Sequence, residues 1–275
     1  MILPNFLCIG SQKAGTTWLE SNLRFNQSVW LPPIKEIHYF DYTYGINTGT
    51  QIWGKGHVDN ALARELRKSS ANAEQVQYLE KIKNHVWFTD DWYQSIFDHK
   101  DRYNKISGDI TPEYSSISQE GIEYAIDYLK YPKIIWIIRD PIDRAISQIK
   151  MVLNRSIGPE PLTKRDWSNF VAKVRYTERG NLERFLPLWE NIAGKDNILY
   201  IPFGNIKSNP LETLGEIEVF LGLDKAEYPS ARKIVHKTKR TDLPDWIIAS
   251  LAREHVTQYN FLTNRFGKEF VSNTI

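Results

Sequence analysis

The sequence contains little sulfur, no long apolar run and no strong excess of either charge. Cys8 is the only cysteine among 275 residues, so an intramolecular disulfide is excluded and a reducing compartment is favoured. The longest strongly apolar run spans residues 134–138, whereas a membrane-spanning helix needs about 20 apolar residues. The net charge is +2, without the large basic excess typical of chains that bind nucleic acid along their length.

The first residues have neither the basic segment nor the long apolar segment of a secretory signal peptide. Residues 2–9 instead form a short apolar run that is typical of a strand. The single cysteine, the short apolar runs, the modest net charge and the missing signal peptide together predict a cytoplasmic chain. We expect it to have no membrane span and no nucleic-acid partner. No pattern in the sequence indicates an oligomeric state.

Short apolar segments alternate with amphipathic segments, a pattern typical of an α/β fold with a parallel sheet. Strands are expected near residues 2–9, 29–31, 105–110, 133–138 and 197–202. Helices are expected near residues 18–23, 57–69, 72–83, 121–129, 142–153, 166–193, 210–222 and 244–258. Residues 42–56 and 232–240 are expected to be loops. No repeat, low-complexity tract or linker is evident, so residues 1–275 are predicted to form one domain with a central parallel sheet flanked by helices.

The segment between the first strand and the first helix has the pattern of a phosphate-binding loop. Gly10 and Gly15 match the glycines of G-x-x-x-x-G-K-[ST], and Thr17 occupies the Ser/Thr position. Thr16 stands where nucleotide triphosphatases have lysine, and the lysine of this loop is Lys13. A lysine inside the loop would lie near the first phosphate beyond a ribose, where a bridging oxygen leaves if the transferred group sits on a 5′-phosphate. An ordinary strand–helix turn is the alternative.

A second anion site is predicted at the end of the apolar strand 133–138. Ligands of open α/β sheets bind at the carboxyl ends of the strands, where Arg139 is placed. Ser147 follows in the next helix, and a guanidinium with a serine hydroxyl suits a phosphate monoester. The alternative is that Arg139 pairs with Asp140 or Asp143. A third basic segment is either an anion site or a solvated surface; it contains Lys233, Lys237, Lys239 and Arg240.

These motifs together resemble those of the sulfotransferases that use 3′-phosphoadenosine 5′-phosphosulfate (PAPS). Residues 13–17 resemble their 5′-phosphosulfate loop, and residues 139–147 resemble their 3′-phosphate motif. The resemblance is closest to the heparan-sulfate-type glycan sulfotransferases, through residues 35–41, 91–93, 108–114, 237–240 and 259–262. The chain departs from that family at Asp109 and Ile110, where the family has glutamate and lysine, and it lacks the family's disulfide and membrane anchor. We therefore expect a relative with a different acceptor.

The resemblance implies a P-loop-like sulfotransferase fold and a function. A sulfuryl group would pass from PAPS to a hydroxyl or amine of a carbohydrate or another small metabolite, releasing 3′,5′-adenosine bisphosphate (PAP). Glu36 is implied as the general base, with His38 as the competing base, and Lys13 as the group that stabilises the leaving phosphate. If residues 35–40 are extended, Glu36 and His38 lie on one face. Cofactor contacts are implied for Lys13, Ala14, Gly15, Thr16, Thr17, Trp18, Arg139, Ser147, Lys237, Lys239 and Arg240.

Acceptor contacts are expected at four positions within or near a probable acceptor-site insertion, residues 42–105. They are Lys35, Trp92, Asp109 and Tyr114. The aromatic residues of 87–97 would either line the acceptor site or pack in the core, and core packing is also the alternative for Trp18. The six histidines are dispersed without metal-ligand spacing, so no metal is expected.

Two other functions compete with sulfuryl transfer. An ATP- and Mg²⁺-dependent P-loop kinase of small molecules would have the same loop, but it needs the lysine that is missing after Gly15. A nucleotide-binding scaffold that has lost catalysis would not need Lys13 and Glu36, both of which are present.

Overall fold

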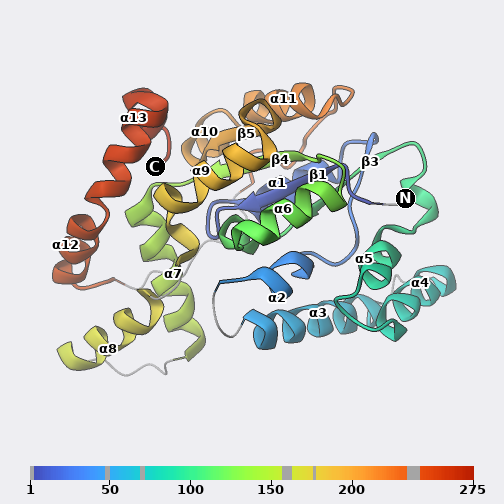
Figure 1. The fold of residues 1–275 in the computed structure, drawn as a ribbon, viewed down its shortest axis with the longest axis horizontal. Coiled ribbons are helices and arrows are strands. Elements are labelled where there is room, and N and C mark those ends of the chain that lie inside the picture. Colours follow the sequence, from blue (N-terminus) through green and yellow to red (C-terminus); the bar gives the residue numbers. More distant parts are fainter. Residues whose placement is uncertain (1–2, 47–49, 69–71, 157–162, 176–177, 234–241) are drawn as a thin grey trace.

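A parallel sheet lies at the centre of the molecule (Figure 1). The computed structural model describes residues 3–275 except 47–49, 69–71, 157–162, 176–177 and 234–241. Within these residues the sheet has the strand order β2-β3-β1-β4-β5, and every pairing is parallel. The strands are β1 (Phe6–Gly10), β2 (Val29–Trp30), β3 (Ile106–Ile110), β4 (Lys133–Ile138) and β5 (Ile198–Pro202). The predicted fold class, a parallel sheet flanked by helices, is confirmed.

The apolar runs of β1 and β4 are covered on both faces, as expected for parallel strands. Ile135 and Ile137 of β4 pack towards α1 (Thr16–Leu23) and α11 (Pro210–Leu221). Ile134, Trp136 and Ile138 pack on the other face, in the core that includes α6 (Gln119–Tyr128) and α9 (Leu182–Ala193). This alternation of side chains along the strand positions the helices in two layers.

Four helices lie beside the second layer and form most of residues 39–97 (Figure 1). They are α2 (Tyr39–Tyr44), α3 (Thr50–Leu66), α4 (Ala73–Asn84) and α5 (Asp90–Phe97). The expectation of a loop over 42–56 is wrong, because α3 already begins at Thr50. Gly54 weakens the helix signal, but a Cβ there would lie 3.4 Å from the His38 side chain, so the small residue lets α3 approach closely.

The remaining helices follow the sheet's carboxyl edge or close the C-terminal end of the chain. They are α7 (Pro141–Ser156), α8 (Lys164–Arg175), α10 (Phe203–Ser208), α12 (Asp245–Glu254) and α13 (Val256–Ser272), with the short 3₁₀ turns η1 (Lys100–Arg102), η2 (Pro112–Ser116), η3 (Glu178–Gly180) and η4 (Lys195–Asn197). The expected last helix, 244–258, is two helices. α13 reaches Ser272, fourteen residues beyond the expected end, with a kink at Gly267, whose backbone is not helical. Arg265 on it pairs with Glu190 of α9. Within the described ranges, no helix combines the length and the apolar character needed to cross a membrane.

The last residues of the chain bond to the edge of the sheet where the loops after β4 and β5 begin. The amide of Asp140 donates to the carbonyl of Thr274 at 2.9 Å, and that of Gly204 donates to Asn273 at 2.7 Å. Thr274 is fully buried. The C-terminus thus supports the same edge of the sheet as the predicted anion sites.

Candidate active site

The glycine-rich loop joins β1 to α1, as predicted. Gly15 is the N-cap of α1 and has a φ of 87°, in the left-handed region that favours glycine. A Cβ at this position would also lie 3.2 Å from both Phe203 and Ile206. No side chain caps the first turn of α1 among the residues described. The backbone amides of this turn are therefore left without a capping side chain, a feature typical of helix ends that bind anions.

Arg139 connects the two predicted anion sites. Its Nη1 donates to the carbonyl oxygen of Lys13 at 2.7 Å. Its guanidinium lies over the Phe203 ring, 4.6 Å from the centroid, and Nη2 is 3.9 Å from Asp143. Burial lowers the pKa of Arg139, while Asp143 and Asp140 oppose this shift. Both proposed roles of Arg139 therefore have support: it reaches the phosphate loop, and it also faces an acidic residue of α7.

The other predicted cofactor residues fall into three situations. Ser147 is buried on α7, two turns after Arg139. Trp18 is a buried residue of α1, and its Nε1 donates to the carbonyl of Ala231 at 2.7 Å, which matches the packing alternative. Three predicted contacts lie outside the described residues: Lys237, Lys239 and Arg240.

Lys35 brings a cation to the start of α1. Its Nζ lies 3.1 Å from Thr17 Oγ1 and 3.4 Å from Thr16 Oγ1. It also lies 3.1 Å from Glu36 Oε1. Sequence reasoning had assigned Lys35 to the acceptor. In the structure, Lys35 places an ammonium group beside the helix terminus where Thr16 has replaced the usual lysine.

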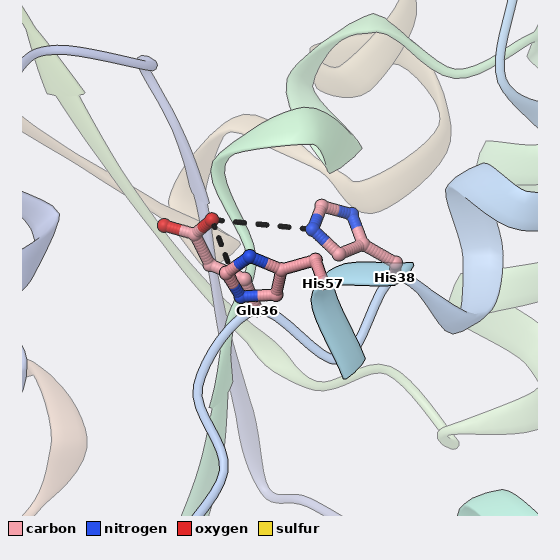
Figure 2. A group of neighbouring side chains, drawn as sticks. All are labelled: Glu36, His38 and His57. Atoms are coloured by element: carbon pink, nitrogen blue, oxygen red, sulfur yellow. Dashed lines mark ion pairs between the residues drawn. The ribbon is translucent and has the colours of Figure 1, made fainter. Parts of the chain in front are cut away.

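Glu36 and His38 lie together, although not for the reason expected. Residues 35–40 are not an extended strand, because Glu36 (φ 61°) and His38 (φ 58°) are both left-handed and α2 begins at Tyr39. Ile37, between them, donates its amide to Thr111 Oγ1 at 2.9 Å. Glu36 Oε2 is 3.9 Å from His38 Nε2 (Figure 2). Such backbone conformations in non-glycine residues are uncommon and are enriched at functional sites.

His57, which sequence reasoning missed, completes the group. It comes from α3, and its Nε2 is 3.9 Å from Glu36 Oε2 and 3.1 Å from the carbonyl oxygen of Lys35. The separation of His57 from Glu36 and His38 in the sequence gives no helical or strand spacing that could have predicted its place in this cluster. Only the packing of α3 against α2 brings His57 to Glu36.

The charges around Glu36 set opposite pKa shifts. Burial raises the pKa of Glu36, but Lys35, His57 and His38 together outweigh burial and hold the pKa below its ordinary value. Burial lowers the pKa of His38, but the charge and hydrogen bond of Asp41 outweigh it, so the pKa is raised. The pKa of His57 is lowered, chiefly by burial. Glu36 is thus ready to accept a proton near neutral pH, because its carboxylate is ionised there.

His38 is held by a buried carboxylate. Its Nδ1 is 2.9 Å from Asp41 Oδ2, and both side chains are almost fully inaccessible. The opposite nitrogen, Nε2, is buried, has no hydrogen-bond partner among the residues described and is directed towards Glu36. Glu36 itself is 29% exposed. Of the two candidate bases, Glu36 is therefore the one that an acceptor in solution can reach directly.

A second buried acid supports the phosphate loop and was not identified from the sequence. Glu113 of η2 accepts from Gln12 Nε2 at 2.8 Å and lies 2.6 Å from Arg179 Nε. Burial raises the pKa of Glu113 to about 7, although Arg179 acts in the opposite direction. Gln12 belongs to the loop and Arg179 to η3, so Glu113 connects the loop to a segment far along the chain.

Three predicted acceptor residues lie in the core instead of lining a cavity. Asp109 accepts from Thr111 Oγ1, Tyr114 OH and Tyr93 OH at 2.7, 2.8 and 3.0 Å. Burial raises the pKa of Asp109 to about 6. Trp92 and Tyr114 have no exposed surface. These side chains stabilise the layer behind Glu36, which agrees with the core-packing alternative for residues 87–97, and we do not assign them acceptor contacts.

A cavity of about 550 Å³ opens beside Glu36. Thr17, Lys35, Glu36 and His57 line it, together with Glu65 and Lys68. The lining is almost entirely polar or charged. The cavity therefore places a polar molecule next to both the start of α1 and the candidate base.

Comparison with known proteins identifies the class. The chain belongs to the sulfotransferase family, whose sequence profile matches residues 4–227. Its fold is similar to that of a sulfotransferase from Alicyclobacillus acidocaldarius, with a TM-score of 0.59, 20% identity and coverage of 100% of this chain and 95% of that one.

Two further solved structures share the fold. The sulfotransferase domain of the Synechococcus PCC 7002 olefin synthase has a TM-score of 0.57 and 19% identity, covering 92% of this chain and 88% of the domain. The sulfotransferase STF9 from Mycobacterium avium has a TM-score of 0.52 and 12% identity, covering 94% of this chain and 77% of that one. The comparison with curated proteins gives no match.

Proposed function

We propose that this protein transfers a sulfuryl group from PAPS to a hydroxyl or amine of a carbohydrate or another small metabolite and releases PAP. The observation that carries this proposal is the hydrogen bond from Arg139 to the carbonyl of Lys13. It joins a 5′-phosphate type of loop to an arginine at the neighbouring strand end. A nucleotide with phosphates on both the 5′ and 3′ positions has the two separate anionic groups that such a pair of sites would hold.

The donors around the loop fit this nucleotide. The uncapped first turn of α1 presents amides of Gly15, Thr16 and Thr17, and the Gly15 position leaves no room for a side chain. Arg139 Nε is buried and has no hydrogen-bond partner among the residues that the structure describes, so the guanidinium retains a donor for a ligand. Arg139 and Ser147 would hold the 3′-phosphate. Lys13 and Ala14 would line the 5′ side.

In this proposal Glu36 takes the proton of the acceptor. Its carboxylate is ionised at neutral pH and exposed to the cavity, and Lys35 holds one of its oxygens. Bound PAPS would supply an electrophilic sulfuryl group on a phosphate leaving group. Lys13 would stabilise the charge on that leaving phosphate, as electrostatic stabilisation requires. Lys237, Lys239 and Arg240 would add cationic contacts to the cofactor.

The kinase alternative is less compatible with the surroundings of Thr17. In P-loop kinases the hydroxyl at this position holds Mg²⁺. Here Thr17 Oγ1 lies 3.1 Å from the ammonium group of Lys35. A cation that already contacts this hydroxyl disfavours a divalent metal at the same oxygen.

We place the acceptor in the polar cavity beside Glu36, with residues 42–105 forming much of its outer side. α3 contributes His57, Arg64 and Glu65 to the lining. A lining of this kind suits an acceptor rich in hydroxyl groups. The carbohydrate option also follows from the resemblance to the heparan-sulfate-type enzymes, although Ile110, which replaces their lysine, is buried here and offers no charge.

Calorimetric titration with PAP and with Mg·ATP tests the proposal on the wild type and on Arg139→Ala. We expect PAP to bind at micromolar concentration without metal and to bind at least ten-fold more weakly to Arg139→Ala. Arg184→Ala, which removes a surface pair with Glu178 on η3, is the control and should bind PAP normally. Preference for Mg·ATP, or PAP binding that is indifferent to Arg139, would contradict the proposal.

A further inference from the structure

We propose that Glu36, His38 and His57 form a three-ligand site for Zn²⁺, whose occupation blocks the candidate active site. One oxygen and two imidazole nitrogens of these residues lie within 4.8 Å of one another (Figure 2). Two histidines and one carboxylate are a common ligand set of zinc sites that keep a fourth position open. The ligand set disfavours Mg²⁺ and Ca²⁺, which prefer oxygen.

His38 has the features of a preorganised ligand. Its Nε2 is buried, has no hydrogen-bond partner within the described part of the chain and is directed at Glu36 Oε2, 3.9 Å away. A buried nitrogen with an unused lone pair or proton is costly unless something binds it. The Nδ1 atom is held by Asp41 at 2.9 Å. Metal-bound histidines typically have such a carboxylate on the opposite nitrogen, which fixes the ring.

Glu36 divides its two oxygens between different partners. Oε1 lies 3.1 Å from Lys35 Nζ, whereas Oε2 is the atom that faces both imidazoles at 3.9 Å. A metal on Oε2 therefore leaves the lysine contact in place. The positive charge of Lys35 nevertheless repels a cation at this distance. Lys35 is thus expected to weaken the site without removing any ligand.

Binding requires only a small contraction. Zinc–nitrogen and zinc–oxygen bonds of about 2.0–2.2 Å place tetrahedral ligand atoms about 3.3–3.6 Å apart. His38 is fixed in the core, but the side chains of Glu36 and His57 are 29% and 38% exposed and can turn towards it. His57 Nε2 must give up its contact with the carbonyl of Lys35, 3.1 Å away, to bind the metal.

Glu36 and His57 line the 550 Å³ cavity, so the fourth position of the metal would open towards it. The inhibitory consequence rests on the proposed function, because it assumes that Glu36 is the base. A bound Zn²⁺ would occupy the carboxylate that must accept the proton, and it would compete with the acceptor for the part of the cavity lined by Glu36 and His57. The metal site itself stands on the geometry alone.

Metal binding is tested without any activity. Isothermal titration of the metal-free wild type with ZnCl₂, in a buffer that does not chelate zinc, should show one site with a dissociation constant at or below the micromolar range. His57→Gln should weaken it at least ten-fold, and Glu36→Gln should weaken it as well. Lys35→Met should tighten it. His85→Gln, a histidine at the C-cap of α4, is the matched control and should leave it unchanged.

Binding of Co²⁺ in place of Zn²⁺ provides a second, spectroscopic test of the metal site. Co²⁺ at the site should give visible absorption bands that disappear in His57→Gln and persist in His85→Gln. Circular dichroism of each variant separates ligand loss from unfolding, which matters most for the buried His38. Absence of stoichiometric Zn²⁺ binding, or binding that His57→Gln leaves unchanged, would overturn the site.

Assays of sulfuryl transfer separate this inference from the proposed function. Zinc should reduce turnover competitively with the acceptor, and EDTA should restore it. If zinc binds at these residues but no sulfuryl transfer occurs with any acceptor, the proposed function fails and the metal site remains. If transfer occurs and stoichiometric zinc leaves it unchanged, the inhibitory role is wrong.

Discussion

Arg139 donates a hydrogen bond from Nη1 to the carbonyl oxygen of Lys13 at 2.7 Å, although the two residues are 126 positions apart. The two loops that follow β1 and β4 are thereby joined at the point where the strand order reverses, the place where open α/β sheets bind ligands. Anything that disturbs one loop is therefore transmitted to the other. Because the two loops are coupled, the binding of a nucleotide with two separated phosphate groups is expected to depend on both loops.

Replacing Glu36 by glutamine should remove the carboxylate that acts as the general base while preserving the shape of the site. We expect kcat to fall by about 10²–10⁴-fold, the usual contribution of a general base. PAP affinity should stay within about two-fold of the wild type, since Glu36 contacts Lys35 and the two histidines and not the phosphate loop. Initial-rate kinetics and PAP calorimetry measure the two effects. Glu120→Gln, on the exposed first turn of α6, is the control.

Near-normal turnover of Glu36→Gln would transfer the role of base to His38. In that case Asp41→Asn becomes the decisive variant. The loss of the Asp41 charge and of its bond to Nδ1 would lower the pKa of His38 and release the ring. Retention of full activity in both variants would exclude the pair as the source of the base.

The Lys35→Met variant should shift the pH dependence of the reaction. Burial raises the pKa of Glu36, and Lys35 makes the largest contribution that lowers it. Without the ammonium group the pKa of Glu36 rises. Because the base works only when deprotonated, the acid limb of kcat/KM moves to higher pH. The quantity to measure is the pH at which this acid limb falls, not the overall rate. The overall rate is less informative because Lys35 also contacts Thr17, so its loss affects more than Glu36.

A matched control for that variant is Lys68→Met, which removes another lysine from the lining of the same cavity. Lys68 pairs with Glu65 at 2.5 Å, not with Glu36. Its loss should leave the acid limb where it is. An acid limb that does not move in Lys35→Met would show that Glu36 is not the group that titrates.

The buried acid Glu113 should make folding stability depend on pH. Its pKa in the folded protein is about 7, raised from 4.5 mainly by burial. Between these values the folded protein keeps a proton that the unfolded chain has lost, so this group reduces stability as pH rises from about 4.5 to 7. Glu113→Gln removes that dependence.

The difference in unfolding free energy, variant minus wild type, should therefore increase with pH across this window, by at most about 1.4 kcal/mol per pH unit. Urea unfolding at pH 5, 6 and 7 measures it. Glu183→Gln replaces an exposed acid of α9 and should give no slope. A Glu113→Gln profile parallel to that of the wild type would contradict the raised pKa.

Gly108→Ala should destabilise the sheet beneath the site. A Cβ on Gly108 of β3 would lie 2.1 Å from the Phe6 ring, which has no exposed surface and cannot move aside freely. Overpacking of this kind costs about 1–3 kcal/mol. Gly215→Ala is the matched control, because a Cβ in the middle of α11 meets nothing within 4 Å. It should stabilise the protein by about 0.5–1 kcal/mol; equal effects of the two alanines in urea unfolding would refute this packing account.

The sheet and the phosphate loop could be predicted because their signals are local. The apolar run of β4 coincides with the expected strand, and the glycine spacing fixes the turn between β1 and α1. Arg139 could be placed at the carboxyl edge because parallel strands end at a common edge. The chemistry of the acceptor side was harder to predict, since its parts are distant in sequence.

His57 and Arg179 show why. His57 contacts Glu36, and Arg179 contacts Glu113, and each contact depends on how a whole helix or turn packs. The burial of Trp92, Tyr114 and Asp109 is likewise a tertiary property, and hydrogen-bonding residues of a core are not distinguishable from substrate contacts by type alone. The helix over 50–56 was missed because glycines that permit close packing look like loop residues in a sequence.

The central position of β1 also determines when the site can exist during folding. Leu7 pairs with Asp109 on one side and with Ile134 on the other. β1 can therefore pair only after strands that lie a hundred or more residues later in the chain have been synthesised. Contacts at such separations form slowly, because the chain entropy is lost before the contacts can repay it. The phosphate loop meets Arg139 only when β4 has docked. A nucleotide that spans both loops therefore binds only the finished sheet, so it should slow unfolding while leaving the rate of first folding unchanged.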